Sequence, residues 1–443
     1  MLVNDEPMAE SEPLLACLRR AAAFERRHAW IAAAAAYGEA LALEPGDGRL
    51  WGNLGHALWL ADLPQAAETA YRQALACSAP APAALCGLAN ALRDLNRFEE
   101  ALPLYEAAGD AEARWGLSQV LIGLERHAEA FAAAEARCAL PGWSPFRPAP
   151  FWGAGGEGEL DADQPLWIWS EQGFGDTLQY LRWIPALARR TGPLHLVVEA
   201  NLVRLLQEGL AWMAAPPRVV SKDTLTFQPL AAHGPLMSLP HRLGPDHAPA
   251  EGGLCLRSPL WSTAGPSLLP EGLPEGPRVG LVWASGRKRE DPFTHREYVK
   301  RSLTPLALWQ LIAGLQGAGA AVIPLQYGHD GELAAALGFR LPAPRLDLGD
   351  FAHLARVVAQ LDLVITVDTA LAHLAGAMGA PGWILLPWSA DPRWLRQRED
   401  SPWYGSLRLF RQSATGDWAS AIEGLLGAFT GWSAAAAAHR SSD

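Results

Sequence analysis

The sequence predicts an α-helical repeat solenoid followed by an α/β region with two parallel sheets. In the first third, tyrosines recur every 34 residues, at Tyr37, Tyr71 and Tyr105. Beyond residue 165, apolar runs such as "LWIWS" and "LDLVITV" alternate with helix-length segments, which is typical of βαβ units. Residues 141–165 are dense in proline and glycine, and this composition predicts a linker between the two regions.

Composition narrows the classes of function. The 443 residues are 50% apolar with a net charge of -11, which argues against nucleic acid as the main partner. The five cysteines form no CxxC pair and no metal-ligand spacing, so we expect reduced thiols and a cytoplasmic protein. The acidic first residues predict no signal peptide, and no apolar run approaches the roughly 20 residues of a transmembrane helix.

The first 140 residues resemble a tetratricopeptide repeat (TPR) array with three clear copies and a degenerate fourth, shortened by about five residues. The second copy fits the pattern W-x2-L-G, A-x3-F/Y, A at Trp51, Leu54, Gly55, Ala67, Tyr71 and Ala74. Stacked hairpins form a concave face, so we expect the repeats to bind a polypeptide. The alternative is that the repeats serve only as a scaffold and for dimerisation, and the sequence is compatible with a homo-oligomer.

The α/β region is expected to form two Rossmann-like halves facing a cleft. A second stretch rich in proline and glycine, at 258–277, separates an N-terminal half, 166–260, from a C-terminal half, 278–428. Ligands of such sheets bind at the carboxyl ends of the strands, so the loops there hold the candidate site.

The segment "LDLVITVDTALAHLAGAMGAP" predicts a strand ending at Val367 and a helix beginning near Ala370. The free N–H groups of that helix start, the Thr369 hydroxyl and the His373 imidazole suit a diphosphate. The alternative is that Asp368 and Thr369 only cap the helix and that His373 belongs to the core.

This segment resembles the D-T-x-L-x-H-L-A signature of the ADP-heptose:lipopolysaccharide heptosyltransferases, which are GT-B glycosyltransferases. The resemblance implies nucleotide-sugar contacts at the matching positions, which are Asp368, Thr369, Ala370, Leu371 and His373. The family commonly has glycine where this chain has Ala370, which leaves less room for a phosphate oxygen.

The earlier stretch "SEQGFGDTLQY" resembles the family's first loop. The resemblance implies that Asp176 is the catalytic base and that Gly173 and Gly175 let the loop lie against the donor. An inverting transfer needs one such base to take the acceptor's proton. The structural alternative is an N-cap for a helix starting at Thr177, and both roles can coexist.

Three further residues are assigned through the resemblance. In a basic run after Ser285, Arg301 aligns best with the family's phosphate-binding residue, and Lys300 lies beside it. Gln326 follows a strand and matches the loop facing the nucleotide. Arg301 and Lys300 have an alternative as part of a solvated charged face.

We therefore expect an inverting, metal-independent glycosyltransferase that needs no cofactor beyond its nucleotide-sugar donor. The expected acceptor is a polypeptide recruited by the repeats. One alternative is a glycan or lipid-linked acceptor for envelope polysaccharide, and another is a TPR adaptor whose glycosyltransferase domain is inactive.

Overall fold

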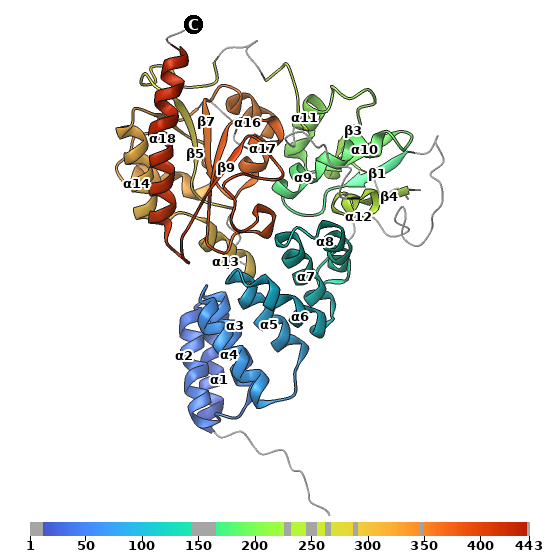
Figure 1. Cartoon of the computed structure of the whole chain (residues 1–443), viewed down its shortest axis with the longest axis vertical. Helices are drawn as coiled ribbons and strands as arrows, with labels where there is room; N and C mark the ends of the chain where they lie inside the picture. Colours follow the sequence, from blue (N-terminus) through green and yellow to red (C-terminus); the bar gives the residue numbers. More distant parts are fainter. Residues whose placement is uncertain are drawn as a thin grey trace, which may run out of the picture. The chain divides into compact units, whose positions relative to one another are not determined.

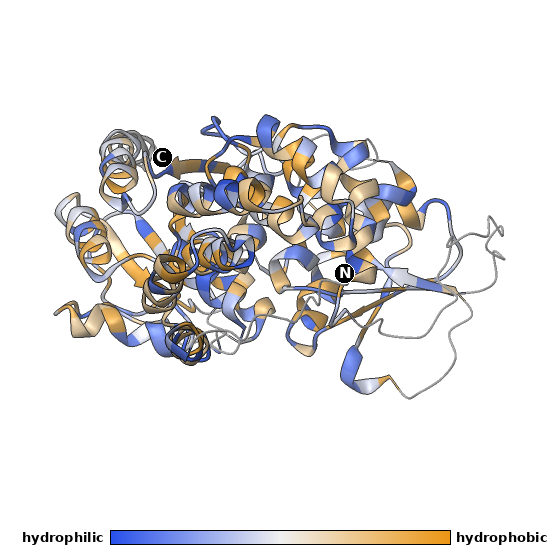
Figure 2. Ribbon diagram, turned by 90° about the horizontal axis from the view of Figure 1, so that it is seen from below, coloured by the Kyte–Doolittle hydropathy of each residue, from blue (hydrophilic) through white to orange (hydrophobic). Residues whose placement is uncertain are grey.

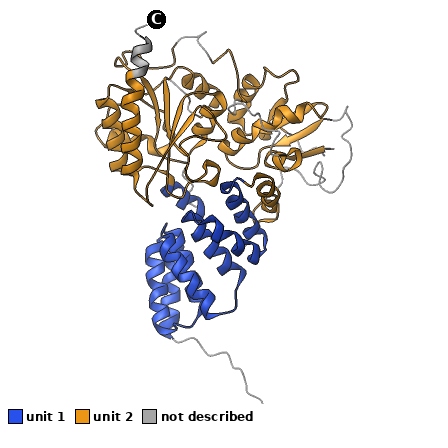
Figure 3. Ribbon diagram, viewed as in Figure 1, with its two compact units in different colours: residues 1–125, 287–300 blue, residues 126–286, 301–443 orange. Residues whose placement is uncertain are grey.

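A computed structural model describes residues 12–143, 165–225, 232–244, 255–261, 267–286, 291–344, 347 and 349–440 (Figure 1). The chain divides into two compact units. One contains residues 1–125 and 287–300, and the other contains residues 126–286 and 301–443 (Figure 3). Most of the predicted linker, residues 144–164, lies outside the described residues.

The first unit is a series of helix hairpins in which each helix packs against the next. Asp47 and Asp110 cap two of the helices by accepting backbone N–H groups, and Pro64 and Pro82 open two others, where a missing N–H costs nothing. The helices are α1 (Glu12–Glu25), α2 (Trp30–Leu43), α3 (Gly48–Leu60), α4 (Pro64–Cys77), α5 (Pro82–Asp94), α6 (Phe98–Ala108) and α7 (Ala111–Gly123).

The repeated tyrosines join one hairpin to the next. A Cβ atom built on Gly87 of α5 would lie 2.3 Å from the buried ring of Tyr71 in α4. Gly116 of α7 stands in the same relation to Tyr105 of α6, also at 2.3 Å. Glycine at these positions therefore admits the tyrosine ring of the preceding hairpin.

The turns inside the hairpins repeat as well. Each holds a non-glycine residue in the left-handed region, with φ of 54° at His28, 60° at Asp62, 61° at Asn96 and 59° at Glu125. The first three are 34 residues apart, whereas Glu125 follows Asn96 by 29, five fewer. The third interval, which leads to the fourth copy, thus has the shortening expected of the degenerate copy.

A helix from the middle of the α/β region completes the first unit. Helix α13 (Pro292–Arg301) follows Asp291, which caps it by accepting the Thr294 N–H at 2.7 Å. Residues 287–300 cluster with the repeats and not with the C-terminal half in which the sequence analysis placed them. The reason is a buried arginine, Arg296, whose partners all belong to this unit.

The second unit begins with the N-terminal half, a four-stranded parallel sheet in the order β3-β2-β1-β4. Its strands are β1 (Leu166–Trp169), β2 (Leu194–Val198), β3 (Arg218–Ser221) and β4 (Ala232–Pro235). The accompanying helices are α8 (His127–Ala134), α9 (Phe174–Tyr180), α10 (Ile184–Ala188), α11 (Ala200–Gly209) and α12 (Leu239–Leu243).

The C-terminal half contains a five-stranded parallel sheet in the order β6-β5-β7-β8-β9. Its strands are β5 (Arg278–Val282), β6 (Ala321–Pro324), β7 (Leu363–Val367), β8 (Gly382–Leu386) and β9 (Leu407–Arg411). Its helices are α14 (Pro305–Gly317), α15 (Leu333–Ala336), α16 (Phe351–Val358), α17 (Ala370–Met378) and α18 (Trp418–Arg440).

Strands β7 and β8 are buried along their whole length, as expected for a parallel sheet covered on both faces. Figure 2 shows apolar residues in orange on strands and on parts of many helices, beside hydrophilic residues in blue. The predicted fold class, helical repeats followed by two parallel α/β halves, is confirmed. No helix in the described part of the chain has the length and apolarity needed to cross a bilayer.

Candidate functional site

The two sheets place both candidate loops at their topological switch points. In the first sheet, β1 lies between β2 and β4, so the loop after β1 opens where the strand order reverses. In the second sheet, the order reverses between β5 and β7. Open α/β sheets bind their ligands at the carboxyl ends of such strands. The loops after β1, β5 and β7 therefore form the candidate site.

The loop after β7 ends in a capped helix. Thr369, in an extended conformation, is the N-cap of α17, and its Oγ1 accepts the Leu371 N–H at 3.3 Å. The hydroxyl of Thr366 lies 3.0 Å from that of Thr369. The helix begins at Ala370 as the sequence predicts, and its first-turn N–H groups give this end a positive potential.

Asp368 and Arg301 lie side by side at this helix end. The Arg301 Nη1 is 3.6 Å from Oδ2 of Asp368, which is 4% exposed. Burial raises the pKa of the Asp368 carboxyl, and the Arg301 guanidinium offsets part of the rise. Arg301 keeps 28% of its side chain exposed, so the same guanidinium can reach an anionic ligand.

His373 lies behind the helix start, enclosed in aromatic rings. Its Nδ1 is 3.0 Å from the Tyr404 hydroxyl, and its ring centroid is 5.4 Å from that of the fully buried Trp394. Burial, with Arg393 adding to it, holds the pKa of His373 well below its ordinary value. The imidazole is therefore neutral at pH 7 and can offer a hydrogen bond but no positive charge.

Asp176 stands at the start of α9, which packs against α17 (Figure 1). Its Oδ2 accepts the Gly173 N–H at 3.2 Å. The expected helix start at Thr177 is wrong, because α9 begins at Phe174 and Asp176 is its third residue. The N-cap is Gly173 and not Asp176, which instead accepts the N–H of that N-cap from the third position of the helix. The other oxygen of the Asp176 carboxylate contacts Arg393 of the C-terminal half.

Arg393 links the two halves, and no motif in the sequence predicts it. Its Nη2 donates to Oδ1 of Asp176 at 2.8 Å, and its Nη1 donates to Oε1 of Gln179 at 2.7 Å. Its Nε lies 3.0 Å from Oδ1 of Asp391. Burial alone would raise the pKa of Asp391, but Arg393 outweighs it and lowers that pKa to about 2.

The glycine of the first loop meets the histidine of the second. A Cβ built on Gly175 would lie 2.7 Å from Cδ2 of His373, which is too close for a real contact. Glycine at this position therefore lets the two loops approach. Nearby, the ring of Phe174 packs on that of Phe351, with centroids 5.0 Å apart.

The structure does not bring Lys300 or the side chain of Gln326 to this group of residues. The Lys300 Nζ pairs with Glu297 at 2.7 Å and the side chain is 7% exposed. The Gln326 amide bonds the backbone of Trp283 and Ala284 and so ties the loop after β6 to the loop after β5. Both contacts are structural, and ligand binding by these two residues stays a prediction.

Ser285 is a second residue that the sequence analysis did not assign. It follows β5 at the switch point, its N–H donates to the Ser302 hydroxyl at 3.1 Å, and it is 4% exposed. Among the described residues its own Oγ has no hydrogen-bond partner. A buried hydroxyl without a partner is costly, and a phosphate oxygen could supply one. No three metal-ligating side chains of the described residues gather in a possible metal site.

Comparison with known proteins finds a family match within the C-terminal half. Residues 332–384, which include Asp368, Thr369 and His373, match the model of glycosyltransferase family 9, the heptosyltransferases. The chain carries a heptosyltransferase-like domain. With the helix hairpins, the predicted resemblance to a TPR protein with such a domain is confirmed. The matched residues of the heptosyltransferase-like domain exclude Asp176 and Arg301, whose roles rest on geometry and on the resemblance.

One relative and several solved structures are similar to the chain. Protein FlbA of Caulobacter vibrioides is 28% identical in an alignment 424 positions long, which covers 86% of this chain and 66% of that protein. The E. coli heptosyltransferase WaaC, solved with ADP-2-deoxy-2-fluoro heptose, is 15% identical, with 60% of this chain and 99% of WaaC covered at a TM-score of 0.41. YrrB, described as a TPR protein with an unusual peptide-binding site, is 20% identical over 28% of this chain and 66% of its own, at a TM-score of 0.25.

Proposed function

We propose that this protein is an inverting glycosyltransferase that moves a sugar from a nucleotide-sugar to a hydroxyl group of a polypeptide. One observation carries the proposal. Arg393 of the C-terminal half holds Asp176 of the N-terminal half at 2.8 Å, next to the α17 helix start. A base candidate and a diphosphate-binding helix end thus belong to one connected group of side chains.

The donor diphosphate is assigned to the carboxyl edge of β5 and β7. The N–H groups of α17 and the Thr369 hydroxyl offer hydrogen bonds to phosphate oxygens. Arg301 supplies the positive charge that the neutral His373 does not, and the Ser285 hydroxyl offers a further donor. The base and the sugar of the donor stay open.

Transfer follows from this placement. Asp176 takes the proton of the acceptor hydroxyl while the oxygen attacks the anomeric carbon from the face opposite the nucleotide. The bond from that carbon to the phosphate oxygen breaks, and its electron pair leaves with the nucleoside diphosphate. Arg301 neutralises the negative charge of the leaving nucleoside diphosphate, and Arg393 does so as well once a bound ligand engages its guanidinium. Since two guanidinium groups supply this charge, we propose that no metal is needed, and transfer should persist in EDTA.

The acceptor is assigned to the repeats. Stacked hairpins present one continuous concave face, and such faces bind extended polypeptide segments. The five cysteines are all unpaired, which supports a reducing, cytoplasmic setting in which nucleotide-sugars are available.

Two measurements test the proposal. Thermal unfolding against ADP, UDP, GDP, CMP and TDP should show stabilisation by one nucleotide, about 2.7 kcal/mol at 100 times its dissociation constant. Arg301→Ala should weaken that effect. If no nucleotide stabilises the protein, the assignment of the donor site is wrong. The alternative of a TPR adaptor with an inactive glycosyltransferase domain is then favoured.

Asp176→Asn is the test of the base. The substituted amide keeps an acceptor oxygen for the Gly173 N–H but takes no proton. Transfer should fall by at least two orders of magnitude with nucleotide affinity nearly unchanged, because the base acts on the acceptor. Residual transfer near the wild-type rate would remove Asp176 from this role.

A further inference from the structure

The imidazole of His373 is held by Tyr404, a buried tyrosine that lies outside every motif of the sequence. Tyr404 comes between β8 and β9, is 1% exposed and belongs to the same compact unit as His373. Its hydroxyl lies 3.0 Å from Nδ1 of His373, which is itself 3% exposed. The two rings meet edge to face, with centroids 5.8 Å apart. The two side chains are therefore hydrogen-bond partners in a buried environment.

A glycine of α17 fixes where the tyrosine ring can lie. A Cβ built on Gly376 would lie 2.3 Å from Cγ of Tyr404, which is too close for a real contact. Gly376 follows His373 by three residues in the same helix, so the two positions share one face of it. Glycine therefore lets the tyrosine ring lie against the helix backbone, with its hydroxyl beside the imidazole one turn earlier.

Arg182 holds the same segment from the N-terminal half of this unit. Its Nη2 donates to the Trp403 carbonyl at 3.1 Å, and its guanidinium carbon lies 5.0 Å from the centre of the Tyr404 ring. The indole N–H of Trp403 donates in turn to the Arg393 carbonyl at 2.7 Å. Tyr404 is thus fixed on one side by a helix and on the other by a buried cation.

The positions of the protons follow from what surrounds this pair. Burial raises the pKa of Tyr404, so its hydroxyl keeps its proton at neutral pH. Among the described residues this hydroxyl has no acceptor other than Nδ1 of His373, and the neighbouring Arg182 carries only donors. A buried donor left without an acceptor costs free energy. The hydroxyl therefore donates to Nδ1, and the proton of the neutral imidazole lies on Nε2.

The Nε2 edge of the imidazole faces the first loop. A Cβ built on Gly175 would lie 2.7 Å from Cδ2 of His373 and 3.2 Å from its Nε2. Within the part of the chain that the structure describes, Nε2 forms no hydrogen bond. Its N–H thus lies between the first loop and the start of α17, where the donor diphosphate is assigned.

We infer that Tyr404 is a positioning residue that fixes the proton of His373 on Nε2, so that the imidazole donates a hydrogen bond to the donor diphosphate and cannot act as a base. This inference rests on the proposed function and narrows it. A base needs a free lone pair directed at the acceptor hydroxyl, whereas the lone pair on Nδ1 is engaged by Tyr404. Removal of the acceptor's proton is then left to Asp176.

Nitrogen-15 spectra of the full-length protein with labelled histidines show at pH 7 which ring nitrogen is protonated. The His373 signals are those that disappear in His373→Gln. We expect a protonated Nε2 and an unprotonated Nδ1 that accepts a hydrogen bond. A protonated Nδ1 would overturn the inference. This measurement needs neither a ligand nor a change at Tyr404, so it decides the tautomer even if variants at Tyr404 do not fold.

Tyr404→Phe keeps the ring against Gly376 and removes the hydroxyl. Because the hydroxyl stabilises the neutral imidazole, its loss should raise the pH at which His373 takes up a second proton in the same spectra. If Nδ1 instead donated to the tyrosine oxygen, this pH would fall, and a fall or no change would contradict the inference. The matched control is Tyr105→Phe, which removes the 2.6 Å hydrogen bond of a buried tyrosine to Asn90 of the repeats and should leave His373 unchanged.

Calorimetric titration with the nucleotide that stabilises the wild type most tests the role in donor binding. Tyr404→Phe should weaken the affinity about fivefold, because the imidazole loses its fixed tautomer and orientation, whereas Tyr105→Phe should not. In a His373→Ala background, Tyr404→Phe should have no further effect, and an equal loss there would show that Tyr404 does not act through His373. If the wild type binds none of the nucleotides, the proposed function itself fails. Wild-type binding that is insensitive to Tyr404→Phe removes only the inference about Tyr404.

Discussion

Gly175 and His373 come from opposite halves of the α/β region and meet at one point. No side chain fits between the Gly175 Cα and the imidazole, since a Cβ would lie 2.7 Å from the ring. The imidazole is held in turn by Tyr404 and by Trp394. The distance between the first loop and the α17 helix start therefore depends on this glycine.

Gly175→Ala should destabilise the protein by about 1–3 kcal/mol, because the new methyl group must displace a buried ring or shift α9. Urea unfolding measures the change. The matched control is Gly52→Ala in α3, where a Cβ meets no atom within 4 Å. That variant should stabilise by about 0.5–1 kcal/mol, since alanine favours a helix interior. Equal stability of the two variants would mean that His373 does not limit the space at Gly175.

The buried His373 also predicts a dependence of stability on pH. Its folded pKa is depressed by burial, while in the unfolded chain it lies near 6.5. Between these values the unfolded chain binds more protons, so stability is lost as the pH falls below about 6.5. We expect the stability difference between wild type and His373→Gln to shrink from pH 8 to pH 5 in urea titrations. Asp368 is present in both proteins, so its own titration largely cancels.

Motifs predicted the residues of the candidate site that lie in contiguous loops, and missed those that complete it from a distance. Thr369 and His373 stand in one short motif, and the loop of Asp176 has its own pattern of glycines. Arg393 contacts Asp176 across 217 residues, and Arg296 reaches Asp94 across 202. A single sequence records neither pairing, because ion pairs leave no periodicity and a basic run usually marks a solvated surface.

Helix α8 belongs to the second unit, although the expected repeat region extends to residue 140. After it, Arg137 is 1% exposed and donates to Glu171, Glu135 and Ser238 at 2.7, 2.7 and 2.9 Å. Glu171 follows β1 at the start of the first loop, and its side chain is 2% exposed. The expected repeat boundary at residue 140 and the division of the units at residue 125 differ for this reason: α8 packs on α12, and Arg137 holds the loop after β1.

Arg137→Met should therefore destabilise the second unit strongly, by about 3–5 kcal/mol, because the Glu171 carboxylate stays buried without its cation. Chemical denaturation of the full chain measures this loss. Arg126→Met is the control, since Arg126 forms an exposed pair with Glu129 and should change stability by no more than about 0.5 kcal/mol. A small effect at both positions would show that Glu171 finds other partners.

At the scale of elements, the strands that lie in apolar runs were predictable and the others were not. Runs such as "LDLVITV" correspond to β7, and the same holds for β1, β2, β5, β6 and β8. Strands β3, β4 and β9 escaped prediction because none of them is a continuous apolar run: "RVVS" has a polar residue at each end, "AHGP" contains histidine, glycine and proline, and "LRLFR" carries two charges. Their pairing with neighbouring strands, and not their own composition, makes them strands.

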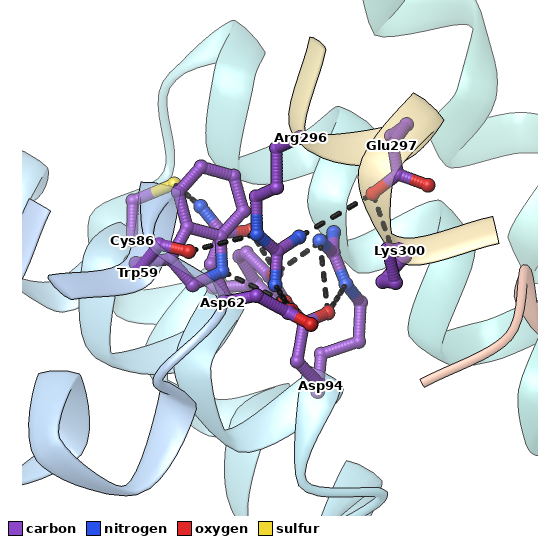
Figure 4. Close-up of polar contacts among 10 residues, drawn as sticks. Trp59, Asp62, Cys86, Asp94, Arg296, Glu297 and Lys300 are labelled. Atoms are coloured by element: carbon purple, nitrogen blue, oxygen red, sulfur yellow. Dashed lines mark hydrogen bonds and ion pairs between the residues drawn. The ribbon is translucent and has the colours of Figure 1, made fainter. Parts of the chain in front are cut away.

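At the scale of the whole molecule, the repeat unit is assembled from two distant parts of the chain. Residues 1–125 contain Asp94, and residues 287–300 contain Arg296, which forms a buried ion pair with it (Figure 4). A fragment of residues 12–125 should therefore be folded but less stable, because Asp94 loses its main counter-charge.

Adding a synthetic peptide of residues 287–304 should restore the stability of this fragment. At 100 times the dissociation constant, the expected gain is about 2.7 kcal/mol, visible as a rise in Tm. The same peptide with Arg296→Ala should give no rise. Equal stabilisation by the two peptides would show that the helix is held by its apolar contacts alone.

The contacts of Arg296 with the repeats also limit how the array can change in length. Trp59 and Asp62 come from one hairpin and Asp94 from the next, so Arg296 contacts all three only when these two consecutive repeats keep their spacing. A whole repeat duplicated before residue 30 would leave that spacing intact, whereas one inserted between residues 62 and 94 would separate the two carboxylates. Growth of this array by duplication is therefore open at its N-terminal end and closed at its centre.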